Sequence, residues 1–486
     1  MSGLRGLDRR PDKAHANLVV MKFGGTSLEN AKAILRTAEI VHGRLERGRK
    51  AIVVVSAMAK VTDQLLAAAV AAGRGDKKGA LMIAARLRNR HTETISDMLC
   101  GELFTEVDAA MRRGFDLLDD LLRGIAAVGE LTPRTRDNVL SFGERISSRM
   151  VAGAFAQHGL NGVRVDSRAC IITDDHYGKA APLEDATEAK LVELVLPLVE
   201  AGHTPVMGGF IGATADGITT TLGRGGSDFT AALVGGALHA GAIEIWTDVN
   251  GIMTTDPRIC ADALRVKTIS FEEAAELAYF GAKVLHPATV LPAVQKNIPV
   301  WVLNSRNPKN EGTKITAMAP RCASPFKSIA VKRRLTIIDI VASRMLMTHG
   351  YLKSVFDVFD QFRCAIDMVS TSEVSISLTV DSNERLPEIC EELGKIADVK
   401  MEGHKALICM VGEDIRGHNG MAGRVFSAIR HINVRMISQG ASEINMSFMI
   451  EESDVEEAIR SLHAEFFVDP DPTVFDVEAR AVAARV

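Results

Sequence analysis

Short aliphatic runs alternate with longer helical stretches from residue 18 onward, and this alternation restricts the fold more than any other feature of the chain. Leu18–Phe23 is predicted to be a strand, Leu28–Leu45 a helix, and Ala51–Ser56 a second strand rich in β-branched residues. Strand, helix and strand in this order favour a parallel α/β unit. Aromatic residues make up only 5% of the chain, which suits parallel strands built from aliphatic side chains.

The alternation continues well beyond this first unit. Asp63–Val128 is rich in Ala, Leu and Arg and has few helix breakers, so it is predicted to be a helical insertion. Later strands are predicted at Gly162–Val165, Thr204–Met207, Ile243–Trp246 and Val300–Leu303. The predicted fold class is therefore α/β, with an open, mainly parallel sheet over residues 18–305 that is sandwiched by helices.

The chain after residue 305 changes character and then repeats itself. Residues 306–328 contain Pro, Gly, Asn and Lys with little periodicity and are predicted to be a linker. Beyond it the sequence repeats at a spacing of 70 residues; the aligned pairs include Gly350 with Gly420, Val355 with Val425, and Ser377 with Ser447. Chance similarity is the alternative, but two βαββαβ-type modules at 329–400 and 401–470 explain the repeat better. Modules of this size bury little surface alone, so we expect pairing within the chain or across a homodimer.

Charge and cysteine usage exclude several classes of function. Residues 1–17 lack an apolar stretch and are predicted to be a disordered leader, and residues 471–486 a tail. A net charge of −4 gives no electrostatic reason to bind nucleic acid or an anionic membrane. The seven cysteines are never spaced as C-x-x-C, which argues against a disulfide framework or a zinc site. We expect a cytoplasmic protein with no resident metal and neither a nucleic-acid nor a membrane partner.

Two glycine-rich turns carry the clearest chemical signals. The first predicted strand ends in Lys22-Phe23-Gly24-Gly25, where bare glycine backbone and a cation favour an anion such as phosphate. The alternative is a helix-capping turn with a solvated lysine. Leu222–Asp228 reads LGRGGSD before an aliphatic helix, so Arg224 can fork onto a carboxylate or phosphate and the helix start keeps Asp228 ionised. The alternative there is a turn whose Ser227 caps the helix.

Other polar residues follow predicted strands or begin helices. Thr247-Asp248 comes directly after a strand, at the edge where open parallel sheets bind ligands. Glu144 lies at a predicted helix start, and Lys283 follows a helix that begins with a capping box, where a solvated surface lysine is the alternative. The chain has no P-loop, no Ser-His-Asp order, no H-E-x-x-H and no G-x-G-x-x-G after a strand.

The chain contains five motifs in the order and spacing of the aspartate kinases, namely KFGGTS, SFGERISSR, TLGRGGSDFTA, WTDVNGIMTTDPR and GAKVLHPAT. Residues Leu18–Leu303 therefore resemble this branch of the amino acid kinase superfamily, and the modules after Ile329 resemble the paired ACT domains of those enzymes. The resemblance implies phosphorylation of the side-chain carboxylate of L-aspartate by ATP with Mg²⁺. The product would be 4-phospho-L-aspartate, on the route to lysine, threonine and methionine.

The resemblance also implies the residues of the reaction site. The implied substrate and phosphoryl contacts are Lys22, Gly24, Gly25, Thr62, Glu144, Arg224 and Asp228. Lys22 would contact the transferring phosphoryl group, Arg224 would clamp an aspartate carboxylate, and Asp228 would organise the site opposite Lys22. Thr62 and Glu144 would hold the amino acid. Because the attacking carboxylate is already an anion at neutral pH, no general base is expected, and catalysis depends on positioning and charge stabilisation.

A further set of residues is implied for the nucleotide and for an effector. The implied nucleotide contacts are Thr247, Asp248, Met253, Arg258 and Lys283, and Met253 departs from the tyrosine that the family commonly has there. Positions that bind lysine in lysine-sensitive members match Met345, Thr348, Leu352, Ile366, Asp367 and Glu373. We therefore expect an amino-acid effector and a homo-oligomer, a dimer or a tetramer, formed through the ACT modules.

Three alternatives remain open. The chain can be a related kinase acting on glutamate, N-acetylglutamate or a nucleoside monophosphate. It can be a catalytically silent amino-acid sensor, although Lys22, Arg224 and Asp228 occur together in it. The repeated modules can also serve dimerisation alone.

Overall fold

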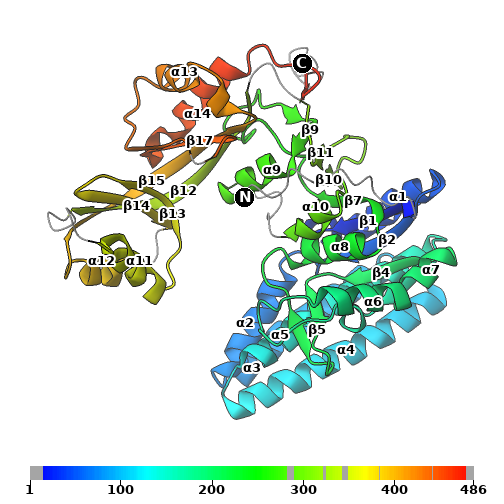
Figure 1. Cartoon of the computed structure of the whole chain (residues 1–486). Coiled ribbons are helices and arrows are strands. Elements are labelled where there is room, and N and C mark those ends of the chain that lie inside the picture. Colours follow the sequence, from blue (N-terminus) through cyan, green and yellow to red (C-terminus); the bar gives the residue numbers. More distant parts are fainter. Residues whose placement is uncertain are drawn as a thin grey trace. The chain divides into compact units, whose positions relative to one another are not determined.

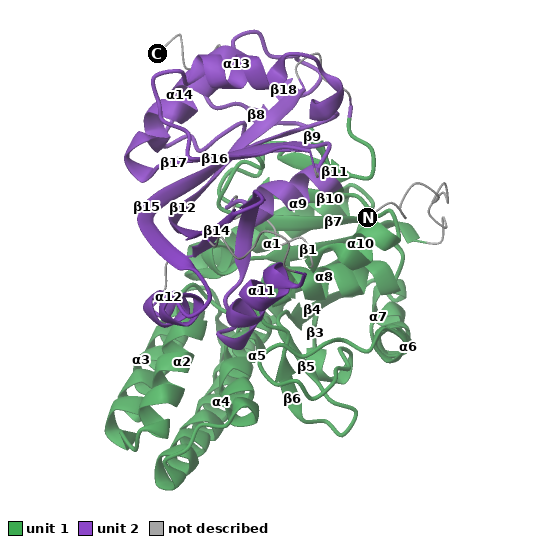
Figure 2. Ribbon diagram, turned by 60° about the vertical axis from the view of Figure 1, so that its left-hand side comes forward, with its two compact units in different colours: residues 1–252, 268–271, 284–319 green, residues 253–267, 272–283, 320–486 purple. Residues whose placement is uncertain are grey.

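The computed structural model describes residues 15–281, 289–320, 325–341, 349–381, 384–440 and 442–477. Figure 2 shows that the chain divides into two compact units. Unit 1 comprises residues 1–252, 268–271 and 284–319, and unit 2 comprises residues 253–267, 272–283 and 320–486. No helix of the described ranges has the length and the apolar character needed to cross a membrane.

Unit 1 is built on an eight-stranded sheet in the order β3-β4-β2-β1-β7-β10-β11-β9. Its strands are β1 His15–Phe23, β2 Lys50–Val55, β3 Gly162–Val165, β4 Thr204–Gly208, β7 Ala240–Thr247, β9 Thr268–Ser270, β10 Val300–Asn304 and β11 Thr313–Thr316. The first six in sheet order run parallel, and only β11 pairs antiparallel, with β10. The predicted mainly parallel sheet is thus confirmed, and each strand predicted before residue 305 is present.

Helices cover both faces of this sheet. Val19, Met21 and Phe23 point into a core shared with the helices that follow β1 and β2. Val20 points to the other face, where the ideal Cβ of Gly235 in α8 would come within 3.8 Å of it. Alternate residues of a strand face opposite sides of a sheet, so a strand that is apolar throughout requires helices on both.

The helices of unit 1 are α1 Ala31–Glu46, α2 Val61–Gly73, α3 Lys77–Ser96, α4 Gly101–Val128, α5 Pro133–Gln157, α6 Glu184–Leu194, α7 Leu196–Glu200, α8 Gly226–Ala237 and α10 Leu291–Gln295. The unit also contains the short 3-10 turns η1 Gly25–Leu28 and η2 Ser167–Ala169 and a hairpin of β5 Ile211–Ala213 and β6 Thr219–Thr221. Helices α2 to α5 pack side by side (Figure 1). In α4, Met111, Phe115, Leu118, Leu122 and Ile125 are buried at helical spacing. The predicted helical insertion is therefore three helices.

Part of the segment predicted as a linker forms a strand. β11 pairs with β10 through Val302 and Thr313 and through Val300 and Ile315, and Ile315 is fully buried. The prediction of irregular structure across 306–328 is wrong for these residues. Four residues with one large apolar side chain are too few to show the period of two that identifies a strand.

Unit 2 contains a six-stranded antiparallel sheet in the order β13-β14-β12-β15-β17-β16. Its elements are β12 Phe326–Val341, α11 Tyr351–Gln361, β13 Ile366–Thr371, β14 Ser375–Asp381, α12 Leu386–Leu393, β15 Asp398–Gly412, η5 Ile415–Gly417, α13 Met421–Ala428, β16 Met436–Ser438, β17 Asn445–Glu451, η6 Glu452–Asp454 and α14 Val455–Phe466. A two-stranded sheet joins β8 Arg265–Val266 to β18 Phe475–Asp476, and residues 272–279 of α9 Phe271–Tyr279 also belong to this unit.

The sequence repeat corresponds to a structural repeat. Strands β14 and β17 have the same length at a spacing of 70 residues. Gly350 and Gly420 are the N-caps of α11 and α13, with φ of 83° and 80°. Glycine adopts this left-handed conformation without steric cost, which explains the aligned glycines. The two modules share one sheet because β12 and β15 pair along their whole lengths, with residues 326–332 opposite residues 407–412.

Candidate active site

Four parallel strands of unit 1 end at one edge of the sheet. Phe23 pairs with Val55 and with Trp246, and Val55 pairs with Gly208. The loops that follow these residues therefore begin side by side. Ligands bind at this carboxyl edge in open α/β sheets, so the segments after β1, β2, β4 and β7 form the candidate active site.

An ion pair lies at the centre of this edge. The Nζ of Lys22, near the end of β1, is 2.6 Å from Oδ1 of Asp228 in the first turn of α8. The two side chains are only 11% and 15% exposed. The structure thus brings together two predicted site residues that lie far apart in the sequence. The N-terminus of α8 carries a partial positive charge that favours an anion at Asp228 or a ligand beside it.

The glycines after β1 allow two loops to approach closely. An ideal Cβ on Gly25 would lie 3.0 Å from the carbonyl oxygen of Ala57 and 3.3 Å from Cα of Ala59. The N–H of Gly24 donates to the carbonyl of Trp246 at 3.1 Å. Helix α1 begins at Ala31 and not at the predicted Leu28, since a 3-10 turn comes first and Asn30 caps α1. The helix start beside Lys22 is that of α8.

Glu144 is a buried carboxyl in the middle of α5, and the prediction that it lies at a helix start is wrong because Thr132 caps this helix and Pro133 begins it. Its side chain is 3% exposed, and Oε1 accepts a hydrogen bond from the N–H of Ala57 at 3.1 Å. Within the part of the chain that the structure describes, Oε2 has no hydrogen-bond partner. Burial raises the pKa of Glu144 to about 8, although the Ala57 N–H lowers it. Thr62, the other predicted amino-acid contact, is half-buried in the first turn of α2.

Arg224 stands on an exposed turn between β6 and α8. Gly223 and Gly225 on either side have φ of 78° and 73°. Arg224 makes no ion pair with another described residue, so its guanidinium is available to an anion. The N-cap of α8 is Gly225 with no side-chain bond, so the alternative in which Ser227 caps this helix is wrong.

The end of β7 is fixed by the end of β10. The carbonyl of Thr247 accepts from both the N–H and the Oγ of Ser305, at 2.8 and 3.0 Å. Asn304 donates to Oδ1 of Asn250 at 2.8 Å. These bonds hold Thr247 and the exposed Asp248 at the carboxyl edge, and the Oγ1 of Thr247 donates to Oδ1 of Asp248 at 3.3 Å.

The other predicted nucleotide contacts lie in unit 2 or beyond the described residues. Arg258 is exposed, and its Nη2 is 2.6 Å from Oδ2 of Asp256. The hydrogen bond from Arg258 lowers the pKa of the Asp256 carboxyl. Met253 is half-buried, and its carbonyl accepts from the Oγ of Ser328 at 2.7 Å. Lys283 falls outside the described residues.

Asp367, a predicted effector contact, is already paired in unit 2. Both of its oxygens lie 2.7 Å from Nζ of Lys332, which also contacts Asp381 at 3.1 Å. Tyr279 of α9 donates a further hydrogen bond to Asp367, and burial raises the pKa of the Asp367 carboxyl in spite of these donors.

The other predicted effector contacts differ in exposure, and two of them are not described by the structure. Ile366 is half-buried, while Leu352 and Glu373 are exposed. Met345 and Thr348 lie outside the described residues.

One buried carboxylate near the site has no motif in the sequence. Asp137 of α5 is fully buried, and its Oδ2 accepts from the N–H of Gly178 at 2.7 Å and from the N–H of Thr221 at 2.9 Å. Thr221 ends β6, just before the turn of Arg224. Asp137 thus ties that turn to α5. The bonded residues are 41 and 84 positions away, so no local pattern points to this role.

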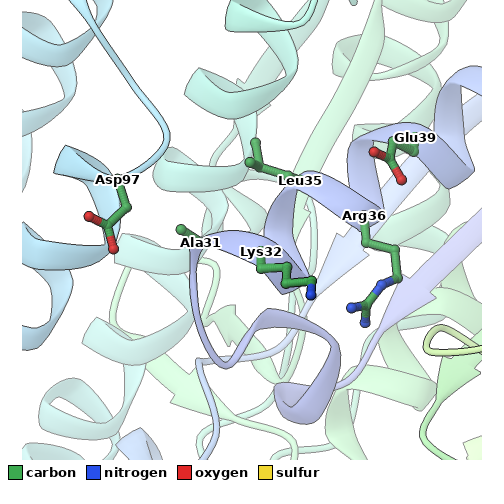
Figure 3. A pocket seen from close by; sticks show the side chains of 6 residues that line it. All are labelled: Ala31, Lys32, Leu35, Arg36, Glu39 and Asp97. Atoms are coloured by element: carbon green, nitrogen blue, oxygen red, sulfur yellow. The ribbon is translucent and has the colours of Figure 1, made fainter.

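A hollow along α1 is separate from these residues (Figure 3). It has a volume of about 440 Å³ and is lined by Ala31, Lys32, Leu35, Arg36, Glu39 and Asp97. Lys32 and Arg36 project from the same side of the helix. None of the predicted site residues lines it, and its charged side chains Lys32, Arg36 and Glu39 lie on the polar face of the amphipathic helix α1, with Asp97 at the end of α3 opposite them.

Comparison with known proteins gives consistent results along most of the chain. The amino acid kinase family profile matches residues 17–304, and an ACT domain profile matches residues 408–466. The chloroplastic aspartokinase 3 of Arabidopsis thaliana is 38% identical over 92% of this chain and 81% of its own length. Aspartokinase III of E. coli in complex with aspartate and ADP (R-state) superimposes with a TM-score of 0.79 at 34% identity, covering 93% of this chain and all of that one. Its complex with lysine and aspartate (T-state) gives a TM-score of 0.80 at the same identity and coverage.

Proposed function

The chain belongs to the aspartokinases, within the amino acid kinase family, and on that premise we propose how its residues perform the reaction. The protein transfers a phosphoryl group from ATP to the side-chain carboxylate of L-aspartate and forms 4-phospho-L-aspartate. The observation that carries the assignment of residues is the Lys22–Asp228 pair at the carboxyl edge of four parallel strands. A mostly buried cation at a glycine-rich strand end, beside the N-terminus of α8, favours a bound anion such as a phosphoryl group.

The aspartate β-carboxylate attacks as an anion, so the site has to bring two anions together. Lys22 would direct its ammonium group toward the transferring phosphoryl group, with the backbone amide of Gly25 beside it. The N–H of Gly24 is bonded to the carbonyl of Trp246, so Gly24 would allow close approach of the backbone without donating to the ligand. Asp228 holds Lys22 in place before the substrates bind. Arg224 would clamp a substrate carboxylate with its free fork of N–H donors.

Glu144 would recognise the ammonium group of aspartate together with Thr62. The free carboxyl oxygen, Oε2, is buried and unpaired among the described residues, which leaves one acceptor for a charged donor. Pairing with an ammonium group would return the pKa of Glu144 toward its ordinary range.

ATP would be held by Thr247, Asp248, Met253, Arg258 and Lys283. Mg²⁺ would arrive on the phosphates of ATP and neutralise part of their charge. In the described ranges no three His, Cys, Asp or Glu side chains gather as a metal site. A cation that keeps its waters and phosphate oxygens as ligands needs few protein donors, so these residues fit Mg²⁺ bound through the nucleotide.

The modules after the linker would regulate the kinase. An amino-acid effector would bind near Asp367, with Met345, Thr348, Leu352, Ile366 and Glu373 as further contacts. We assign residues 18–305 to catalysis, 329–400 and 401–470 to the two ACT modules, and expect a cytoplasmic homo-oligomer formed through them. A silent sensor would have no need of the Lys22–Asp228 pair.

A coupled assay of ATP consumption tests the substrate assignment. We expect turnover with L-aspartate and none above background with L-glutamate, and inhibition by at least one of lysine, threonine and methionine. Turnover that does not depend on aspartate would refute the assignment. Full activity in the presence of all three amino acids would leave the ACT modules a dimerisation role only.

A further inference from the structure

The loop between β7 and β9 passes from unit 1 to unit 2 at the peptide bond between Ile252 and Met253. Ile252 is held in unit 1, where its N–H donates to Oγ1 of Thr313 at 2.8 Å. From Met253 to Lys267 the chain belongs to unit 2. It then returns to unit 1 as β9, which pairs with β11. The sequence predicted this segment, called here the 253–267 loop, to be part of the catalytic domain.

Thr254 anchors the start of the 253–267 loop to the second ACT module. It is fully buried, and its carbonyl accepts from the N–H of Ile329 on β12 at 2.7 Å. Its Oγ1 accepts from the N–H of Leu264 and lies 2.9 Å from Nε2 of His463 on α14. The Thr254 hydroxyl therefore connects the start of the loop both to Leu264, near its end, and to α14.

The end of the loop is anchored by residues far downstream. β8 pairs antiparallel with β18, and Arg265 forms an ion pair with Asp476 at 2.7 Å, with side chains 7% and 18% exposed. The N–H of Lys267 donates to the carbonyl of Val474 at 2.8 Å. These contacts are largely buried, where ion pairs and hydrogen bonds are costly to break on one side.

His463 is itself fixed by packing. It is buried, its ring stacks on Phe467, and Phe467 meets Phe475 edge-on. The same aromatic group thus supports both the imidazole that contacts Thr254 and the strand that carries Asp476. A ring held in this way presents Nε2 at a defined position.

We infer that His463 and Asp476 are positioning residues for the nucleotide, because together they hold the 253–267 loop, which carries Met253 and Arg258. The inference rests on the proposed function, in which these two residues contact ATP. The residues that hold the loop, on β12, α14 and β18, all belong to unit 2, as the loop itself does.

Steady-state kinetics of the full-length protein test this inference with a matched pair of variants. His463→Leu removes the hydrogen bond and keeps an apolar group of similar size, whereas His463→Gln retains a polar atom within reach of Thr254. We expect His463→Leu to raise KM for ATP on the order of tenfold, with kcat and KM for aspartate within about twofold. His463→Gln should restore most of the ATP affinity. Arg460→Ala, at an exposed position on the same helix, is the control and should behave as the unmodified protein.

A second variant and a second measurement separate positioning from a general loss of stability. Asp476→Asn weakens the pair with Arg265 outside α14 and should raise KM for ATP in the same direction. Hydrogen exchange of amides 253–267 should accelerate in both variants while exchange in β1 stays unchanged. Unchanged KM for ATP in His463→Leu and Asp476→Asn, or an equal rise in KM for aspartate, would overturn the inference.

The variant Arg258→Ala distinguishes failure of the inference from failure of the proposed function on which it rests. An unchanged KM for ATP in Arg258→Ala refutes the nucleotide role of the loop and removes the premise. A raised KM for ATP in Arg258→Ala, with no change in His463→Leu, refutes the inference alone.

Discussion

Lys22 carries the largest single role in the proposed reaction, and its replacement gives the simplest prediction. Lys22→Ala removes the cation that faces the transferring phosphoryl group, so kcat is expected to fall by about 10² or more. The circular dichroism spectrum should be unchanged because the apolar core of β1 is formed by Val19, Met21 and Phe23 and not by Lys22. Lys32→Ala, which removes an exposed cation from α1, is the control. Turnover of Lys22→Ala close to that of the unmodified protein would remove the proposed role.

Glu144 makes aspartate binding depend on pH. With a pKa of about 8, the carboxyl is mostly protonated near neutral pH in the free protein, and only its ionised form pairs with the substrate ammonium. KM for aspartate is therefore expected to fall as pH rises toward 8 and to level off above it. A KM that is flat between about pH 6 and pH 8 would contradict the proposed pairing.

The same shift predicts the pH dependence of stability. The folded pKa of about 8 lies above the value of 4.5 that the group has when exposed, so the folded protein keeps a proton that the unfolded chain releases. The contribution to the free energy of unfolding falls as pH rises from 4.5 to about 8 and is constant above it. Denaturant titration of the protein and of Glu144→Gln at several pH values should show this difference, and parallel curves would contradict it.

Asp137 is expected to act on the substrate through the turn of Arg224. In Asp137→Asn a buried N–H₂ would replace Oδ1, which has no hydrogen-bond partner among the described residues, at a cost of about 1–3 kcal/mol, and the hold on Thr221 would weaken. KM for aspartate should rise while KM for ATP stays constant. Asp120→Asn, on the exposed face of α4, is the control. An equal rise in both KM values would indicate a purely structural role.

Individual residues also show where sequence reasoning ends. The sequence identified Lys22 and Asp228 because each stands in a glycine-rich motif at an element boundary. It did not identify Asp137 or His463, since their partners lie 84 and 209 positions away. It also predicted Arg258 as a nucleotide contact but did not show that the guanidinium pairs with the carboxylate of Asp256, two residues before it.

At the scale of elements, the aligned glycines before α11 and α13 allow a direct test of the repeat. Gly420 has φ of 80°, so Gly420→Ala forces an L-residue into a left-handed conformation and is expected to lower the free energy of unfolding by about 1 kcal/mol. Gly423 lies inside α13, where an added Cβ meets open space. Gly423→Ala should instead raise the free energy by up to about 1 kcal/mol. Thermal unfolding measures both, and a stabilising Gly420→Ala would contradict the assigned cap.

Strand positions were the most predictable elements because buried parallel strands are continuous aliphatic runs. Lys50–Val55 is buried over its last five residues and was visible without any structure. β11 was missed because its pairing with β10 and β9 gives it order that its own four residues do not encode. The pairing of β12 with β15, which joins the two modules in one sheet, was also not predicted. The register between distant strands cannot be read from the sequence of either strand alone.

At the scale of the whole molecule, the proposed regulation would depend on a contact that the structure shows in the absence of an effector. The ammonium of Lys332 lies 2.7 Å from both oxygens of Asp367, the carboxylate proposed to bind the effector. An effector ammonium would have to displace it. Lys332→Met is therefore expected to lower the concentration of effector that halves activity, because a competing cation is removed.

Inhibition curves with lysine, threonine and methionine measure this effect. Lys400→Met, an exposed position on the same sheet, serves as the control. A higher concentration for half inhibition in Lys332→Met would show that Lys332 helps to bind the effector instead.

The pairing of β8 with β18 has a consequence for biosynthesis. A ribosome makes residues 265–266 long before residues 475–476, and Arg265 and Asp476 are 211 positions apart. During that interval β8 has no strand partner, whereas the strands of the unit 1 sheet are all made once β11 ends at Thr316. Translation that stops between β11 and β12 would therefore release a polypeptide with an assembled phosphoryl-transfer edge and a 253–267 loop that lacks the residues that hold it, Ile329, His463 and Asp476.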